Sequence, residues 1–350
     1  MTADASPSAL RPRICMWSYH WPPEYSGAGL QARRLARALA ARGWHVWALT
    51  STGETGPVTE TDDEGMRVVR VPRSRARHFK AVAAQTIWRY WRALGRRRRD
   101  FDLLHVHSAY LDAALGATLA RRWGKACLVK NTLADADLAH WGQGLWGKWQ
   151  RWAFQSVGAF VGPSREAAGE FAAVGLPRRR VHHIPNGVDT AVFHPATPGE
   201  RRSLRGKLGL PGEARLVLNL SALTPRKGTD LLVEAMGQVA SRHSDVHLAL
   251  VGPWERDGKP LEGATADWLP ALRRRIAALG LEERVHIPGA QSNAPGWLRA
   301  ADLFAFPAVN EGLPNAVLEA MATGLPMAAA AIAPLEGVAI DGENALLAVP

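Results

Sequence analysis

Residues 311–324 read Glu-Gly-Leu-Pro-Asn-Ala-Val-Leu-Glu-Ala-Met-Ala-Thr-Gly, and this stretch decides how the second half of the chain folds. It follows an apolar run that is typical of a buried strand. Pro314 suits the first helical turn, and Gly324 suits the end of a helix. The predicted order is therefore strand, loop and helix, with Glu311 in the loop and Glu319 inside the helix.

The two carboxylates of this stretch are well placed to bind a polar ligand. Free backbone N–H groups at the start of a helix attract anions such as a diphosphate. One carboxylate before the helix and one within it can accept hydrogen bonds from hydroxyl groups of a sugar or a ribose. The stretch therefore predicts a site for a nucleotide-sugar.

The spacing of Glu311 and Glu319 resembles the Glu-x7-Glu signature of the retaining glycosyltransferases of family four, which have the GT-B fold. Two glutamates alone would also fit a surface helix with a capping residue. The surrounding residues of the stretch agree with the family as well, which the simpler interpretation does not explain. The resemblance runs from about Trp17 to Pro350, nearly the whole chain.

Strands and helices are predicted to alternate in both halves, which indicates an α/β protein with parallel sheets. The length of 350 residues is sufficient for two domains. The segment Asn186-Gly-Val-Asp189, followed by Phe193, resembles the family's crossover between domains. We therefore expect a GT-B protein with two Rossmann-like domains facing a cleft, at residues 1–190 and 191–350, and a linker at residues 196–200. Ligands of such sheets bind at the carboxyl ends of the strands.

The segment Ser221–Gly228 follows the predicted first strand of the second domain. Its Lys227 precedes a helix, where an ammonium group can neutralise a diphosphate as it leaves. Lys227 matches the family's lysine, while Ala222 stands where family members often have an arginine. The resemblance implies that Lys227 stabilises the leaving group, with Arg226, at a different spacing, as a second candidate cation. A solvated loop pair is the alternative.

The resemblance also assigns the remaining donor-side residues. Glu311 is expected to hold hydroxyls of the donor sugar and Glu319 the ribose, and the catalytic candidates are Glu311, Lys227 and His107. Glycines before the first long helix are expected to approach the donor, because a glycine backbone can come close to a ligand. The predicted donor site comprises Gly27, Gly29, Arg226, Lys227, Glu311, Gly312, Leu313, Asn315 and Glu319.

The segment His105-Val-His107 ends a predicted strand of the first domain, with both imidazoles on one face. A strand end is a normal place for catalytic or acceptor-binding groups, and His107 lies further out. Two histidines packed at a strand tip explain the pattern equally well. Many family members carry another histidine after the following strand, where this chain has Asn131 and Thr132. This departure leaves the acceptor-side chemistry open.

Two other enzyme motifs are present only in part. Asp135 and Asp137 imitate an Asp-x-Asp metal motif, but the motif stands alone, and similar GT-B enzymes use cationic side chains and helix dipoles in place of a metal. We therefore expect no metal and no cofactor, with the nucleotide-sugar as a substrate. Gly27-x-Gly29-x-x-Ala32 fits a dinucleotide fingerprint of a dehydrogenase. The glycines come too late after the strand, however, and no acid follows for a ribose.

The chain carries 43 Lys and Arg against 32 Asp and Glu, a net charge of +11. This balance favours anionic partners, and no motif points to nucleic acid. Residues 73–99 combine arginines with Trp88 and Trp91, and more tryptophans follow at residues 141–152. A basic amphipathic helix can lie on anionic lipid. A solvated helix packed by its aromatic face is the alternative.

The remaining composition points to the cytosol. Cys15 and Cys127 fall in strand-like runs and are expected to be buried thiols, which fits a reducing compartment. We find no signal peptide and no membrane span. The expected location is the cytoplasm, where the protein is either free or attached peripherally to the inner face of the membrane.

Together these features predict a retaining hexosyl- or related glycosyltransferase that moves a sugar from a nucleotide-sugar to a hydroxyl of a glycan or a lipid-linked saccharide. The runner-up is a non-catalytic binding module on a degenerate GT-B fold. Family members usually continue with further helices, so a chain that stops at Pro350 is expected to have a shortened C-terminal domain. This feature, Ala222 and the absent histidine favour that second hypothesis. It would bind nucleotide weakly and show no turnover.

Overall fold

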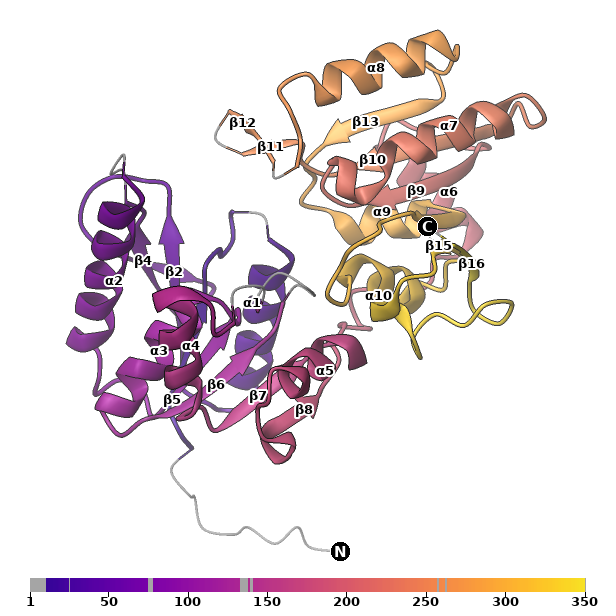
Figure 1. Cartoon of the computed structure of the whole chain (residues 1–350). Coiled ribbons are helices and arrows are strands. Elements are labelled where there is room, and N and C mark those ends of the chain that lie inside the picture. Colours follow the sequence, from indigo (N-terminus) through magenta and orange to yellow (C-terminus); the bar gives the residue numbers. More distant parts are fainter. Residues whose placement is uncertain are drawn as a thin grey trace, which may run out of the picture. The chain divides into compact units, whose positions relative to one another are not determined.

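The computed structural model of the chain describes residues 11–24, 26–74, 78–132, 138, 141–256, 258–261 and 263–349. The chain divides into an N-terminal unit that ends at Pro185 and a C-terminal unit that begins at Asn186 (Figure 1). We predicted a domain boundary after residue 190, slightly further along the chain. Each unit has its own sheet and its own hydrophobic core.

The sheet of the N-terminal unit has the strand order β3-β4-β2-β1-β5-β6-β7-β8. Its described pairs are parallel except that of β3 and β4, which are joined through Glu64 and Gly65. Both turn residues have positive φ, as the tightest hairpin turns require. The strands are β1 (Ile14–Ser18), β2 (Val46–Thr52), β3 (Thr59–Asp63), β4 (Met66–Pro72), β5 (Leu103–His107), β6 (Ala126–Lys130), β7 (Ala159–Gly162) and β8 (Val181–His183).

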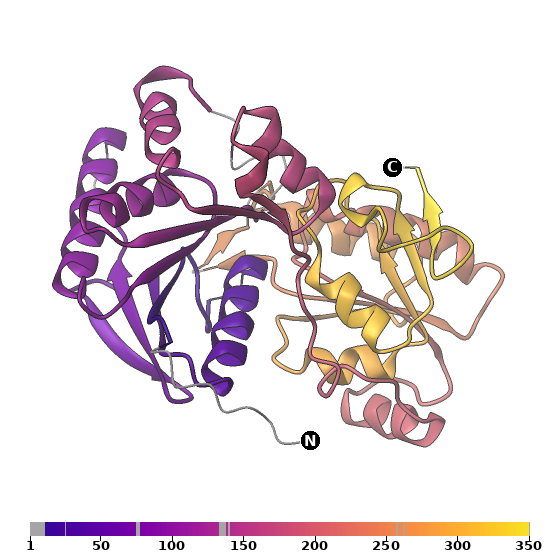
Figure 2. The same ribbon diagram turned by 90° about the horizontal axis from the view of Figure 1, so that it is seen from below.

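The helices of the N-terminal unit cover opposite faces of this sheet (Figure 2). Right-handed connections require this, because the step from β1 to β2 and the step from β5 to β6 run in opposite directions. Helix α1 (Gly27–Ala41) packs Ala32 and Ala36 on one face. The other face and its larger core are covered by α2 (Phe79–Arg96), α3 (Leu111–Arg122), α4 (Gly144–Phe154) and α5 (Arg165–Ala173).

The sheet of the C-terminal unit has the order β13-β10-β9-β14-β15-β16, and its described pairs are parallel. A separate hairpin consists of β11 (Glu255–Arg256) and β12 (Lys259–Pro260). The strands of the sheet are β9 (Arg215–Leu220), β10 (Val246–Val251), β13 (Val285–Gly289), β14 (Leu303–Phe306), β15 (Met327–Ala330) and β16 (Leu346–Ala348).

Two hydrophobic clusters lie on the two faces of the second sheet. Helices α7 (Thr229–Ala240) and α8 (Trp268–Ala278) cover one of them. The other is covered by α6 (Pro198–Lys207), α9 (Ala294–Ala300) and α10 (Asn315–Ala322). Short 3-10 turns occupy Arg178–Arg180, Pro225–Lys227 and Ala333–Leu335. Both units therefore have the three-layer α/β arrangement that the alternating pattern predicted.

One prediction about local structure was wrong, and one strand was missed. Residues 196–200 are not a linker, because Thr197 and Glu200 form a capping box that starts α6. Strand β3 was not predicted, since its sequence Thr-Glu-Thr-Asp-Asp has almost no buried side chain and therefore no hydrophobic alternation. A capping box is visible in a sequence, whereas a polar edge strand leaves no such signal.

Several smaller predictions can be compared with the described residues. Cys15 and Cys127 are buried free thiols, as predicted. None of the described helices is long and apolar enough to cross a membrane. Asp135 and Asp137 lie outside the described residues, as do Arg75 and Arg77.

Substitution of Leu218 tests the core of the C-terminal unit. Leu218 lies on β9 and is fully buried, so Leu218→Ala should lower the free energy of unfolding by about 2–5 kcal/mol. The matched control is Leu231→Ala on α7, where the side chain is 56% exposed and the expected change is within about 0.5 kcal/mol. Urea unfolding of both variants is the measurement, and equal losses would contradict this assignment of the core.

Candidate functional site

The candidate donor site lies at the carboxyl ends of β9 and β14, which are neighbours in the second sheet. Buried polar side chains join the two strand ends. The amide of Asn219 donates to the carbonyl oxygen of Ala305 at 2.9 Å and accepts from the hydroxyl of Ser221 at 2.7 Å. The loops that leave these strands, one with Lys227 and one with Glu311, therefore start from a fixed base.

Glu311 is the largely buried centre of an ionic cluster between these two loops, whose outer member, Arg226, is 38% exposed. Its Oε1 lies 3.2 Å from Nη1 of Arg226 and also forms an ion pair with the ammonium group of Lys227. Nη1 of Arg226 donates in addition to the carbonyl oxygen of Asn310 at 2.6 Å. The structure thus brings together Arg226, Lys227 and Glu311, which the sequence analysis had assigned to one donor site.

Burial sets the electrostatics of this cluster. Burial lowers the pKa of Lys227, and the Glu311 carboxylate partly opposes that effect by favouring the charged ammonium. The side chains of Lys227 and Glu311 are only 13% and 11% exposed. The carboxylate that we assigned to sugar hydroxyls is therefore also the counter-ion of the lysine.

Backbone conformation brings the two loops close together. Gly228 has φ of +64°, and a Cβ added there would lie 2.8 Å from the carbonyl oxygen of Pro307. A side chain at this position is therefore excluded both by strain and by lack of space. Gly228 ends the 3-10 turn that carries Arg226 and Lys227, so its conformation fixes where the two cations stand.

Helix α10 begins directly after the loop that carries Glu311. Pro314 is its N-cap and does not lie in its first turn as predicted. Gly324, with φ of +73°, lies just beyond the C-cap. Gly312 and Leu313 are buried in the loop, and Glu319 is buried on α10, where it is 5% exposed.

The sequence analysis missed the side chain that holds the start of α10. Nδ2 of Asn186 donates to the carbonyl oxygen of Leu313 at 3.0 Å and to Oδ1 of Asn315 at 3.1 Å. Val188 packs against the core of the C-terminal unit, and Phe193 is part of that core. The Asn-Gly-Val-Asp segment had marked the crossover, but nothing in its spacing indicated a hydrogen bond to a helix more than 100 residues away.

The other predicted site residues belong to the N-terminal unit. Gly27 is the exposed first residue of α1, and Gly29 is buried. A Cβ on Gly29 would lie 2.4 Å from the carbonyl oxygen of His20, so this glycine is required for packing of the helix on the preceding loop. We had explained Gly29 only by the approach of a ligand.

His105 and His107 lie on β5 with ring centroids 4.4 Å apart. We had expected His107 to be the more accessible of the two, because it lies nearer the strand end. It is 2% exposed, however, whereas His105 is 8% exposed. Burial, with a smaller contribution from the Lys130 charge, lowers the pKa of His105 to about 3. Burial first, and then His105 and Lys130, lower the pKa of His107 well below its usual value. Both rings are therefore neutral at pH 7.

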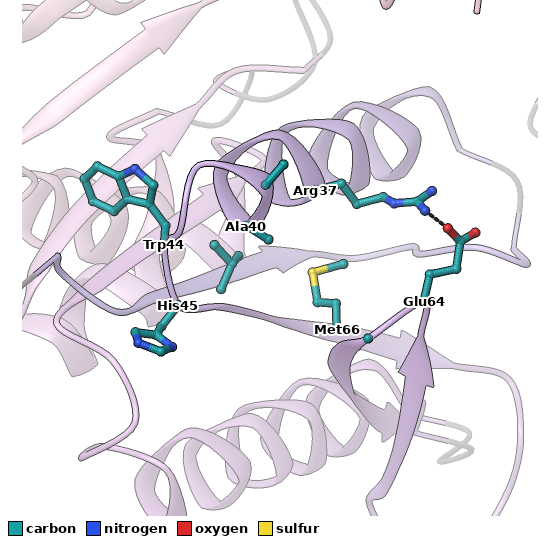
Figure 3. A pocket seen from close by; sticks show the side chains of 9 residues that line it. Arg37, Ala40, Trp44, His45, Glu64 and Met66 are labelled. Carbon is teal, nitrogen blue, oxygen red and sulfur yellow. Dashed lines mark ion pairs between the residues drawn. The ribbon is translucent and has the colours of Figure 1, made fainter.

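A cavity of 350 Å³ lies elsewhere in the N-terminal unit (Figure 3). It is lined by the second half of α1 and by residues where β2 and β4 begin, including Trp44, His45 and Met66. An ion pair between Arg37 and Glu64 closes one side. The cavity is at the amino ends of these strands, so it contains none of the predicted site residues.

Within the part of the chain that the structure describes, no group of three or more His, Cys, Asp or Glu side chains is arranged to hold a metal ion. Asp135 and Asp137, which imitate an Asp-x-Asp motif, fall outside that part. The described candidate site consists of two basic side chains, the carboxylates of Glu311 and Glu319, and the start of a helix.

Comparisons with known proteins identify the family of the chain. Residues 25–192 match the family model described as Glycosyltransferase Family 4, and residues 214–350 match the one described as Glycosyl transferases group 1. A GDP-mannose-dependent alpha-(1-6)-phosphatidylinositol monomannoside mannosyltransferase of Mycolicibacterium smegmatis is 32% identical over 299 residues, 80% of this chain and 70% of the relative. A D-inositol 3-phosphate glycosyltransferase of Xylanimonas cellulosilytica is 29% identical over 97% of this chain and 85% of the relative.

Solved structures share the fold at low sequence identity. Sucrose-phosphate synthase of Thermosynechococcus elongatus superposes with a TM-score of 0.78 at 21% identity, covering 97% of this chain and 86% of that one. HepE of Anabaena, in complex with UDP and glucose, superposes with a TM-score of 0.73 at 21% identity over the same shares.

The fold and these matches define an enzyme, a glycosyltransferase of the GT-B class. The chain belongs to glycosyltransferase family four, whose members transfer sugars from nucleotide-sugars with retention of the anomeric configuration. The predicted family, fold class and reaction are confirmed. Nothing in the matches favours a dehydrogenase or a non-catalytic module.

The histidine pair predicts how stability depends on pH. Below about pH 6.5 the unfolded chain protonates His105, whereas the folded chain keeps it neutral down to about pH 3. Stability should therefore fall as the pH is lowered through this range, by up to about 1.4 kcal/mol per pH unit for each such histidine. His105→Asn should make the free energy of unfolding depend less steeply on pH. Urea unfolding at pH 7, 6 and 5 measures this slope.

The control for this prediction is His45→Asn, the same substitution at an exposed histidine. It should leave the slope as it is in the unchanged protein. An identical slope in the His105→Asn protein would contradict the assignment of His105 as a buried neutral imidazole.

Proposed function

We propose that Lys227, Arg226, Glu311 and Glu319 hold the nucleotide-sugar donor of this glycosyltransferase. The observation that carries the proposal is the ionic cluster at the carboxyl ends of two neighbouring parallel strands. In it the largely buried Glu311, in the loop before α10, pairs with Lys227 and Arg226, in the turn before α7. Ligands of such sheets bind at these strand ends. We assign the roles of the two glutamates from the resemblance to the Glu-x7-Glu signature. Glu311 accepts from hydroxyls of the donor sugar, and Glu319 accepts from the ribose.

Lys227 and Arg226 stabilise the diphosphate as it departs with the bonding electrons of the sugar–oxygen bond. Positive charge in a site of low dielectric acts mostly on the transition state, where the leaving group becomes more negative. A bound diphosphate competes with Glu311 for the ammonium group of Lys227, which frees the carboxylate to accept from sugar hydroxyls. Retention is explained by attack of the acceptor on the face that the leaving phosphate vacates, and we assign no protein nucleophile.

Three polar atoms near this cluster support a ligand at these loops. Oγ1 of Thr224, Oγ1 of Thr229 and Oδ1 of Asn310 are buried and have no hydrogen-bond partner within the described residues. Thr224 and Thr229 flank the turn that carries Lys227, and Asn310 precedes Glu311. Buried polar groups are rarely left unsatisfied, so atoms of this kind commonly pair with water or a ligand.

The acceptor that we propose is a hydroxyl of a glycan or of a lipid-linked saccharide. One relative is named for a phosphatidylinositol monomannoside and another for an inositol phosphate, which supports a polyhydroxylated acceptor. The sugar and the base of the donor stay open. We further propose that the reaction requires no metal, since Lys227 and Arg226 supply positive charge at the diphosphate.

We also propose that the N-terminal unit attaches to an anionic membrane surface from the cytoplasmic side. Trp88 and Trp91 on α2 are 54% and 48% exposed, and Trp146 and Trp152 on α4 are 38% and 45% exposed. Both helices cover the same face of the sheet. The packed side of α2 consists instead of Tyr90, Ala93 and Leu94.

Basic side chains accompany these tryptophans. The guanidinium of Arg92 lies 5.5 Å from the ring centroid of Trp88, and that of Arg121 lies 5.0 Å from the ring centroid of Trp152. Exposed tryptophans beside cations are suited to the headgroup region of an anionic bilayer. This surface would bring the enzyme to a lipid-linked acceptor.

Lys227→Met tests the donor site. It removes the charge while keeping the length of the side chain, and it should lower kcat by roughly 100-fold or more in a sugar-transfer assay, because the leaving diphosphate loses its partner. Lys207→Met, at an exposed lysine near the end of α6, is the matched control and should leave kcat unchanged.

A thermal-shift panel of UDP, GDP and ADP identifies the base, since a ligand that binds only the folded chain raises its apparent stability. Glu319→Gln should abolish the shift of the one nucleotide that binds. A shift that persists undiminished in this variant would overturn the role of Glu319.

The double variant Trp88→Ala/Trp91→Ala tests the membrane surface. Its affinity for vesicles of phosphatidylcholine and phosphatidylglycerol should fall by about 10-fold or more, because two interfacial side chains are removed. Sedimentation with the vesicles is the measurement. Leu231→Ala/Val239→Ala removes exposed apolar side chains from the C-terminal unit and should bind as the unchanged protein does. Equal losses in the two double variants would argue against this surface.

A further inference from the structure

A row of buried polar side chains crosses the carboxyl ends of β1, β5 and β6 in the N-terminal unit. Ser18 pairs in register with His107, and His107 pairs in register with Lys130. Residues paired in this way on parallel strands lie about 4.8 Å apart and point to the same face. Their exposed fractions are 1%, 2% and 8%, so the whole row is buried.

The row faces the side of the sheet that α1 covers. The residues directly before its members, Trp17, Val106 and Val129, belong to the core on the other face. Alternation along each strand therefore places the row on the face of α1. Helix α1 packs against β1 and β5, and it begins at Gly27, after the loop that leaves the carboxyl end of β1.

His107 has hydrogen-bonding capacity that the described residues do not use. Neither of its ring nitrogens has a partner among them, and Nε2 of His105 on the same face also has none. A buried donor or acceptor without a partner costs about 1–3 kcal/mol. The arrangement therefore suits a ligand that supplies an acceptor for an imidazole N–H.

The charge of the row indicates the kind of ligand. Burial lowers the pKa of Lys130 to about 8, and Lys130 contributes to the lowered pKa of both histidines. An anion in contact with the row would favour the protonated lysine and would accept a hydrogen bond from the neutral imidazole. A neutral sugar hydroxyl would supply only the second of these interactions.

We propose that Lys130 and His107 bind an anionic group, a phosphate or a carboxylate, carried by the sugar acceptor. Lys130 supplies the charge, His107 donates one N–H, and Ser18 provides a hydroxyl at the end of the row. This inference rests on the proposed transfer to a hydroxyl acceptor. The diphosphate of the donor has its own cations in Lys227 and Arg226, which lie in the other unit.

Inorganic phosphate is the first probe, used with the full chain labelled with 15N-histidine. The imidazole resonances of His107, assigned by their absence in His107→Gln, should shift on titration. Lys130→Met should weaken this binding by about 10- to 100-fold, and Lys130→Arg should retain most of it. Lys227→Met should leave it unchanged. Absence of a shift, a shift that survives Lys130→Met, or one that depends on Lys227 would each overturn the proposal.

The second measurement separates an acceptor group from free phosphate. Transfer to myo-inositol 3-phosphate and to myo-inositol is compared, and Lys130→Met should bring the ratio of the two kcat/KM values towards one. Phosphate binding at His107 without any preference for the phosphorylated acceptor would overturn the assignment to the acceptor. If no acceptor is used at all, the proposed function fails and the acceptor assignment fails with it, while the resonances of His107 still decide whether the row binds an anion.

Discussion

The ion pair between Lys227 and Glu311 is the interaction on which the C-terminal unit most depends. A charge removed from water is costly unless a partner of opposite sign stands close, and removal of one partner leaves the other buried and uncompensated. The charge of Lys227 on one loop is therefore stabilised by the charge of Glu311 on the other loop. The same requirement that holds the loops together also assembles the residues that we assign to the donor diphosphate.

Supports on both sides keep this pair in place. Asn219 joins the ends of β9 and β14, and Asn186 holds the first residues of α10. At the opposite end of β14, Oδ2 of Asp302 accepts from the backbone N–H of Leu216 at 2.7 Å and from the guanidinium of Arg205 at 2.5 Å. The strand is thus fixed at its amino end by charge and at its carboxyl end by a buried amide. Catalysis by electrostatic preorganisation requires such rigidity, because the charges must already stand where the transition state needs them.

The sequence predicted those features that depend on local pattern. Alternating apolar runs predicted the parallel strands, and the Glu-x7-Glu stretch predicted a loop and a helix with one glutamate in each, which the structure contains. Features that arise from contacts distant in sequence were not predictable. The bond from Asn186 to Leu313 and the need for glycine at position 29 both depend on atoms that only the folded chain brings together. Strand β3 was missed because an edge strand needs no buried face.

The two units bury a lysine in different ways, and this difference separates their chemistry. Lys227 is buried against a carboxylate, so its charge is compensated within the C-terminal unit and is available to a diphosphate by exchange. Lys130 is buried beside two imidazoles whose pKa values are lowered and whose ring nitrogens are not all paired within the described residues. A neutral histidine carries no charge of its own, but it can donate a hydrogen bond to an anion. The first arrangement suits an anion that must leave, and the second suits an anion that must be recognised and kept.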